Sequence, residues 1–295
     1  MILKKIKENG LKWFFWRLKR EIVNPSHPLI RAILDGMLKV WNRWASIGKE
    51  KQNEDILYTI FDLKVAPITF NISEFLLDSE FEANKSGKSG FVVIFVPGVD
   101  ENEYGWKEYD EIVDTNSKLW RFHNIVLPIT LLAPKCKGVY ILPNRSSVSK
   151  IVKDHTVYPN TYDGVNIRYI DIVDFYRKLD KPGQVSGLCA TKQGLRYIED
   201  WITRKEINRP IVSITLRQSD FDPTRNNKIK EWVRFCDYLK KEGYCPVIVP
   251  DTDHAFNSEE LFPEIIVFKE CSWNMGLRIA LYETCYLNYF VPSGP

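Results

Sequence analysis

The sequence predicts an α/β protein with two doubly wound, Rossmann-like domains, preceded by an N-terminal helical segment. Three observations support this fold class. Strand-like and helix-like segments alternate from residue 56 to the end, the same rhythm occurs twice, and strand-like segments such as FVVIFVPG (91–98) and PIVSITLR (210–217) are continuous apolar runs. Such runs are typical of parallel strands buried on both faces, and their alternation with helices predicts a sheet covered on both sides.

We expect three parts along the chain. Residues 1–54 form a basic amphipathic helical segment, residues 55–206 a first domain, and residues 207–295 a second domain that is incomplete, because its last strand is followed only by Ser-Gly-Pro. The expected strands are 56–63, 91–98, 138–142, 210–217, 244–250, 264–269 and 286–292. Apolar spacing and capping residues predict helices at 72–83, 115–132, 168–179, 191–204, 226–242 and 274–285.

Charge and cysteine usage exclude several classes of protein. The 295 residues carry 41 Lys and Arg against 38 Asp and Glu, and the excess lies in residues 1–22, so a globally basic nucleic-acid binder is excluded. The six cysteines are widely spaced, without a CxxC pair, which favours reduced thiols in a cytoplasmic protein. The four histidines show no metal-ligand spacing, so we expect no metal site and no bound cofactor.

The N-terminal segment has two interpretations. Lys and Arg mixed with Trp13, Phe14, Phe15 and Trp16 suit a helix that lies on an anionic membrane surface. The same helix could instead pack as a cap on a domain. No run approaches the roughly 18 apolar residues of a membrane span, and no signal-peptide pattern is present. We therefore predict a cytoplasmic protein, with peripheral membrane contact through residues 1–22.

Polar residues follow several predicted strands of the second domain, where ligands of open α/β sheets bind. Arg217, Gln218 and Ser219 close the first of these strands, and an arginine there can bind a diphosphate through its planar fork. A surface arginine is the equally weighted alternative. Ser293 and Gly294 follow the last strand, where small residues let backbone N–H groups approach phosphate oxygens.

Two acidic residues of the second domain are further candidates. Asp251 follows the second strand, in the loop Asp251-Thr252-Asp253. Glu283 has apolar neighbours in the sequence, so we expect a buried or cleft-facing carboxylate that needs a partner. That partner is either a ligand hydroxyl or a structural group such as Arg278 or a backbone cap.

Residues 208–295 resemble the carboxy-terminal domain of GT-B glycosyltransferases, with the closest likeness to bacterial heptosyltransferases and fucosyltransferase-like enzymes. The resemblance rests on IVSITLR, PVIVPDTD and GLRIALYETCYLNYFVPSGP, with Pro292 where an acidic or polar residue often stands. It implies a GT-B arrangement of the two domains, a nucleotide-sugar donor held by Arg217 and Ser293-Gly294, and a glycan or lipid-linked acceptor. It also implies transfer without a metal.

No catalytic base matches the family residue by residue. The candidates are Asp100, Glu101 and Glu103, in the polar loop after the strand FVVIFVPG, which would face the cleft between the domains. Taken singly, each of them is better explained as a solvated loop residue.

Other motifs and functions were weighed against this hypothesis. The DTD sequence resembles the metal motif of GT-A glycosyltransferases, but it lies in the second repeat, which favours a capped loop with His254 at the surface. GKSG (87–90) precedes a strand, whereas a P-loop follows one. Two alternatives stay open: a nucleotide-sugar epimerase of the same fold, and a non-catalytic, membrane-peripheral assembly protein.

Overall fold

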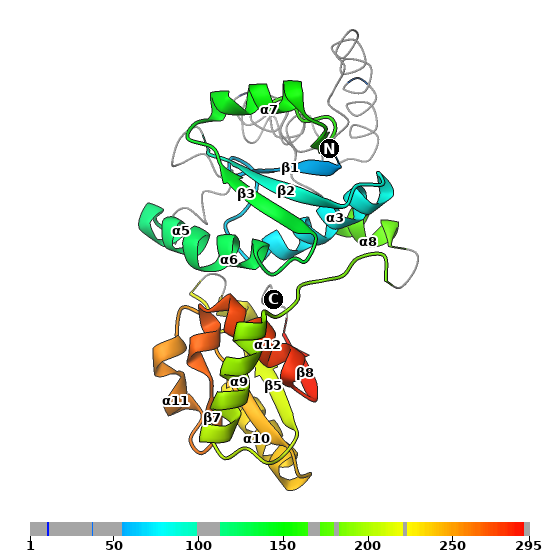
Figure 1. Cartoon of the computed structure of the whole chain (residues 1–295). Coiled ribbons are helices and arrows are strands. Elements are labelled where there is room, and N and C mark those ends of the chain that lie inside the picture. The colour runs from blue at the N-terminus through cyan, green and yellow to red at the C-terminus, as the bar shows by residue number, and fades with distance from the viewer. Residues whose placement is uncertain are drawn as a thin grey trace.

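The computed structural model describes Leu11, Met37 and residues 55–98, 113–164, 172–179, 183–220 and 223–291. Two four-stranded parallel sheets, each flanked by helices, account for most of these residues (Figure 1). This arrangement confirms the predicted fold class of two doubly wound α/β domains. The N-terminal helical segment predicted at 1–54 lies outside the described residues, apart from Leu11 and Met37.

The first domain contains a sheet with the strand order β3-β2-β1-β4. Its strands are β1 (Ile56–Asp62), β2 (Gly90–Val96), β3 (Cys136–Ile141) and β4 (Val157–Tyr158). Its helices are α3 (Ile72–Lys85), α5 (Thr115–Arg121), a π-helical turn η1 (Phe122–Val126), α6 (Leu127–Thr130), the 3-10 turn η2 (Arg145–Ser147), α7 (Val148–Asp154) and α8 (Ile172–Lys178). Apolar side chains of β1 and β2 alternate between one core under α3 and α6 and a second core under α7.

The second domain repeats this order as β7-β6-β5-β8, again with parallel strands. Its strands are β5 (Ile211–Thr215), β6 (Cys245–Val249), β7 (Ile266–Val267) and β8 (Leu287–Phe290). Its helices are α9 (Lys192–Arg204), η3 (Pro223–Arg225), α10 (Ile229–Lys241), η4 (Ala255–Asn257), α11 (Ser258–Leu261), η5 (Lys269–Ser272) and α12 (Met275–Thr284). Helix α10 covers one face of the sheet, and α9 and α12 cover the other.

The structure differs from the expected elements in three ways. Helix α9, which the expected boundary at residue 206 assigned to the first domain, packs through Ile198 against Ile211 and Val247 of the second sheet. The segment expected as strand 264–269 pairs only at β7, and a 3-10 turn begins at Lys269. Strand β4 and helix α7 were not predicted, since a two-residue strand and a seven-residue helix leave almost no periodic pattern.

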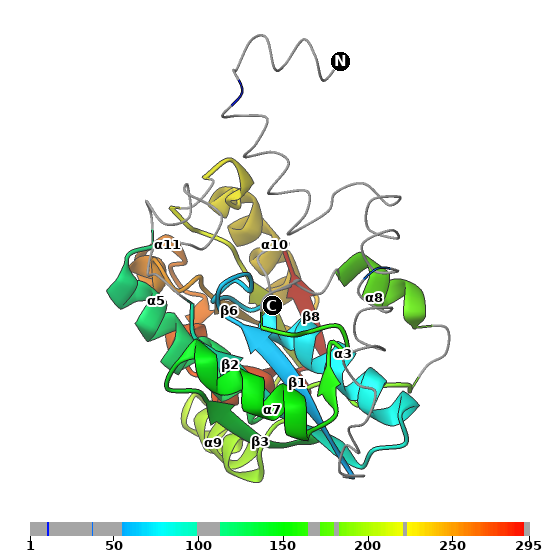
Figure 2. The ribbon, with the colours of Figure 1, turned by 90° about the horizontal axis from the view of Figure 1, so that it is seen from above.

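Helix α12 joins the two domains. Its residues Ala280 and Leu281 belong to the core of the second domain, whereas Met275 is part of the buried apolar cluster of the first domain. Seen in Figure 1, α12 lies at the junction below α6, and Figure 2 shows the two sheets stacked along the view. The backbone N–H of Cys189, in the connection between the domains, donates to the Leu132 carbonyl. The junction is therefore a packed contact.

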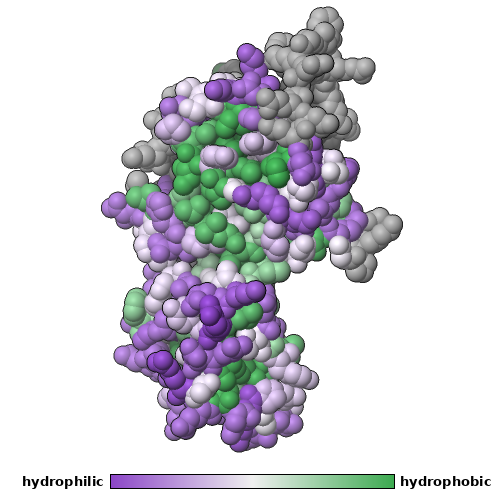
Figure 3. All heavy atoms as spheres, viewed as in Figure 1, coloured by the Kyte–Doolittle hydropathy of each residue, from purple (hydrophilic) through white to green (hydrophobic). Residues whose placement is uncertain are grey.

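The two domains present different surfaces on the face drawn in Figure 3. Apolar side chains gather over the first domain, whereas the second domain is mainly polar there. Leu131 and Ile141 are among the exposed apolar residues of the first domain.

One buried carboxylate ties the strand ends of the first sheet together. Asp62, the last residue of β1, is 4% exposed. Its carboxylate accepts hydrogen bonds from both terminal nitrogens of Arg145, at 2.7 and 2.5 Å, and from the Tyr162 hydroxyl at 2.6 Å. The Arg145 guanidinium also donates to the Pro97 carbonyl at 2.8 Å. Burial raises the pKa of Tyr162, and the charge and hydrogen bond of Asp62 raise it further, so this hydroxyl stays a donor.

We predict that Asp62→Asn lowers the free energy of unfolding by about 3 kcal/mol, because it removes the buried counter-charge of the half-buried Arg145. Urea denaturation measures this loss. The control is Glu231→Gln, which breaks an exposed pair with Arg234 and should cost no more than about 0.5 kcal/mol. Equal effects of the two variants would contradict a structural role for Asp62.

Candidate functional site at the strand ends of the second domain

Arg217 follows β5 and is held inside the loop that it begins. It is 5% exposed, its backbone N–H donates to Asn227 Oδ1 at 2.5 Å, and its Nη1 donates to Asn226 Oδ1 at 2.6 Å. The predicted diphosphate-binding arginine is thus at the carboxyl end of the strand, as expected, but a side chain from its own loop already fixes its orientation.

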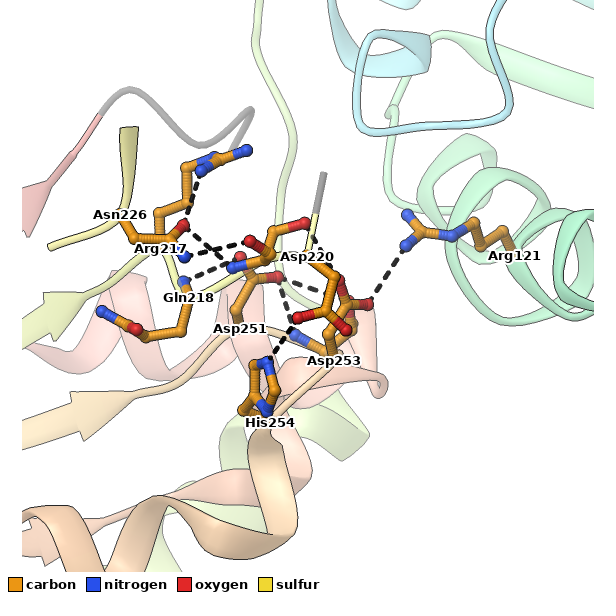
Figure 4. A network of polar contacts seen from close by, with 10 residues as sticks. Arg121, Arg217, Gln218, Asp220, Asn226, Asp251, Asp253 and His254 are labelled. Atoms are coloured by element: carbon orange, nitrogen blue, oxygen red, sulfur yellow. Dashed lines mark hydrogen bonds and ion pairs between the residues drawn. The ribbon is translucent and has the colours of Figure 1, made fainter. Parts of the chain in front are cut away.

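The loops after β5 and β6 are joined by hydrogen bonds, as Figure 4 shows. The Gln218 N–H donates to Asp251 Oδ2 at 3.1 Å, and the Ser219 hydroxyl donates to Asp253 Oδ2 at 2.9 Å. The Ser219 N–H donates to Asn226 Oδ1 at 3.0 Å. The structure therefore brings together Arg217, Gln218, Ser219 and Asp251. A phosphate that binds these two amides must replace oxygens of Asp251 and Asn226.

Asp251 is the most buried carboxylate of this cluster. Loss of hydration raises its pKa above the ordinary value, while the Thr252 and Gln218 amides and the Arg278 charge act in the opposite direction. Its Oδ1 accepts the Thr252 N–H at 2.8 Å. DTD lies in a loop after β6, as expected, but the expected cap was wrong, because neither η4 nor α11 has a side-chain cap at its start.

The first domain reaches this cluster through Arg121, the last residue of α5. Its Nη2 lies 3.3 Å from Asp253 Oδ1, and both side chains are partly exposed (Figure 4). The strand-end loops of β5 and β6 therefore lie at the junction with the first domain. His254 is partly exposed, and its Nε2 lies 3.2 Å from Oδ1 of the exposed Asp220.

Arg278 is a member of this region that the sequence analysis did not assign to the site. It lies on α12 and is 4% exposed, and its charge opposes part of the rise in the pKa of Asp251. Its guanidinium carbon lies 4.9 Å from the centre of the Phe70 ring, in the loop after β1. The available signal was an arginine within the apolar helix GLRIALY, which predicts a buried charge with a specific role.

Glu283 does not belong to the site, and the expectation of a buried carboxylate there was wrong. The side chain is exposed, and its Oε1 accepts the Ala190 N–H at 2.5 Å. Helix α12 begins beside the carboxyl end of β6, where the Ser272 hydroxyl donates to Pro250, and ends where β8 begins. Glu283 lies in its last turn, far from that edge, so the backbone partner is the correct alternative.

Several predicted site residues lie outside the described part of the chain: Ser293, Gly294, Asp100, Glu101 and Glu103. The strands before them are described. Strand β8 ends at Phe290, paired with Thr215 of β5, so the strands that precede Ser293 and Arg217 end side by side. Strand β2 ends at Val96, before the loop with the three acidic candidates.

In the described part of the chain, no three His, Cys, Asp or Glu side chains gather as metal ligands would. No described helix combines the length and the apolar character needed to cross a membrane. Of the six cysteines, all of them described, Cys236 and Cys271 are buried and Cys189 is exposed, and none forms a disulfide.

The raised pKa of Asp251 predicts a pH-dependent stability difference. An Asp whose pKa rises on folding favours the folded state when protonated, and this contribution is lost as pH rises through the folded-state value. Asp251→Asn is neutral at every pH, so its stability relative to the wild type should rise as the pH rises from below the ordinary Asp value of 3.8 to pH 7. A pH-independent loss from the acceptor oxygen that Asn lacks does not change this trend. Urea denaturation from pH 3 to 8 tests this, with the exposed Asp237→Asn as control. A variant that loses stability increasingly at high pH would contradict it.

Comparisons with known proteins give structural likenesses alone: no family model matches the chain, and no curated protein matches it in sequence. A family 9 glycosyl transferase from Veillonella parvula is 11% identical, with 81% of this chain and 76% of that chain covered at a TM-score of 0.48. The E. coli ADP-heptose lps heptosyltransferase II is 12% identical, with 81% and 79% covered at a TM-score of 0.47. At these identities and scores, neither structure assigns an activity to this chain.

Proposed function

We propose that this protein transfers a sugar from a nucleotide-sugar donor to a hydroxyl of a glycan or lipid-linked acceptor, without a metal. The observation that carries the proposal is the position of Arg217 at the topological switch point of the second sheet. Strand β5 lies between β6 and β8 in this sheet. The chain enters β6 after α10, on one face of the sheet, and enters β8 after α12, on the other face. Ligands of open α/β sheets bind in the crevice outside the carboxyl ends of the strands at such a point.

The charges in this region suit a donor diphosphate. The Arg217 guanidinium is a planar, cationic fork that can form paired hydrogen bonds with phosphate oxygens. If the Gln218 and Ser219 N–H groups give up their hydrogen bonds to Asp251 and Asn226, they become two more donors at the same strand end. Together these groups would stabilise the negative charge that develops on the leaving diphosphate.

The proposed reaction needs a base on the opposite side of the cleft. The acceptor oxygen forms a bond to the anomeric carbon, the bond from that carbon to the diphosphate breaks, and a base takes the hydroxyl proton. Asp100, Glu101 and Glu103 are the proposed candidates, because their loop follows the carboxyl end of β2 in the domain that faces the cluster. Residues 1–22 would hold the protein at the anionic membrane surface that carries a lipid-linked acceptor.

We predict that Arg217→Ala weakens the binding of nucleoside diphosphates by about tenfold or more, since a hydrogen bond to a charged group contributes about 1.5–3 kcal/mol. Isothermal titration calorimetry against a panel of nucleoside diphosphates measures the change. Arg234→Ala removes the same charge from the exposed face of α10 and should leave the affinity unchanged. If the Arg217 variant keeps wild-type affinity, Arg217 does not hold the diphosphate.

Product analysis separates transfer from the two alternative functions. Incubation of the full chain with nucleotide sugars and candidate acceptors, in the presence of EDTA, should release nucleoside diphosphate only when an acceptor is present. Conversion of the donor without an acceptor would identify an epimerase. Absence of both reactions, together with no rise in unfolding temperature with any nucleotide, would favour a non-catalytic assembly protein.

A further inference from the structure

Arg278 has a hydrogen-bonding group that the described protein does not satisfy. Its Nη1 is buried and has no hydrogen-bond partner. Among the described residues, one other buried side-chain atom shares this property, the neutral hydroxyl oxygen of Ser79. A buried donor without a partner costs about 1–3 kcal/mol, and more when the group is charged, so such a group is uncommon in a folded protein.

The remaining contacts of Arg278 fix the plane of its guanidinium. Nε donates to the Tyr282 hydroxyl at 2.9 Å, and that hydroxyl lies 2.7 Å from Oγ1 of Thr215, the last residue of β5. The Phe70 ring of the first domain packs against the guanidinium. Arg278 is therefore oriented relative to the strand end that also carries Arg217, two residues after Thr215.

Asp251, whose charge interacts with that of Arg278, does not complete the hydrogen bonds of Arg278. Asp251 is close enough for the two charges to interact, but its oxygens accept the backbone N–H groups of Thr252 and Gln218. The pair therefore gives Arg278 a counter-charge without a partner for Nη1. Charge balance with Asp251 requires only a cation at this position, and it does not explain why the cation is a planar guanidinium with several donors.

We propose that Arg278 binds an oxygen of a diphosphate through Nη1, as a second cationic group beside Arg217. The choice of a diphosphate as the anion rests on the function proposed above. Because Nη1 is covered, the diphosphate reaches it only when α12 and the loop of Phe70 move apart, and the bound anion then lies between the two domains. Binding of the leaving group is in this way coupled to the contact that joins them.

The decisive variant is Arg278→Lys, which keeps the charge beside Asp251 and removes the forked donor. Titration calorimetry with inorganic pyrophosphate and with nucleoside diphosphates should show a loss of affinity of about tenfold or more, by a similar factor for both kinds of ligand. The matched control is Arg234→Lys on exposed α10, which should bind as the wild type does. If Arg278 only balances the charge of Asp251, lysine replaces it fully and the affinity does not change, which would overturn the proposal.

A second variant keeps the proposal testable if Arg278→Lys does not fold. Tyr282→Phe removes the hydroxyl that orients Nε while leaving the ring in place, and it should weaken pyrophosphate binding several-fold. Full pyrophosphate affinity in this variant would count against a fixed guanidinium as the binding group.

Failure of this inference and failure of the proposed function give different results. If the wild type transfers a sugar and the Arg278→Lys variant binds diphosphates normally, Arg278 is not a binding group and the proposed function stands. Weakened pyrophosphate binding in that variant, without transfer to any acceptor by the wild type, supports the binding group and removes the function. A wild type that binds neither pyrophosphate nor any nucleoside diphosphate overturns the inference.

Discussion

The packing of α12 between the two domains is the contact on which the proposed site depends. One side of this helix supplies Ala280 and Leu281 to the core of the second domain, and its first residue, Met275, is buried in the core of the first. This shared burial holds the carboxyl ends of β5 and β6 against the first domain, where Arg121 reaches Asp253. A helix shared by two cores also explains why a charged residue on it, Arg278, is removed from water.

The fold could be predicted from the sequence because its strands are buried on both faces. Continuous apolar runs such as those of β2 and β5 have few alternative structures, and the helices between them keep a clear period. The packing of α9 could not be predicted. Whether α9 covers the first or the second sheet depends on the contact of Ile198 with Ile211 and Val247, and such tertiary packing leaves no mark in the helix sequence itself.

The positions of site residues could be predicted where the sheet topology determines them. The hydrogen bonds between these residues could not be predicted. Arg217 and Asp251 had to lie at one edge, because parallel strands end together. Their hydrogen bonds with Asn226 and Gln218 depend on loop conformation, which the sequence pattern does not encode. Glu283 shows the same limit, since apolar neighbours in the sequence did not prevent its exposure at the end of α12. The role of Arg278 became visible only through its missing hydrogen-bond partner.

Amide hydrogen exchange in the presence of a nucleoside diphosphate tests the central claim most directly, because the backbone donors of the proposed site are the groups observed. If the diphosphate binds at the ends of β5 and β6 against α12, the amides of 217–219 and 251–253 and the loop of Phe70 exchange more slowly with the ligand. The amides of the edge strand β3 should not change. Protection confined to other parts of the chain, with unchanged exchange at 217–219 and 251–253, would contradict the account.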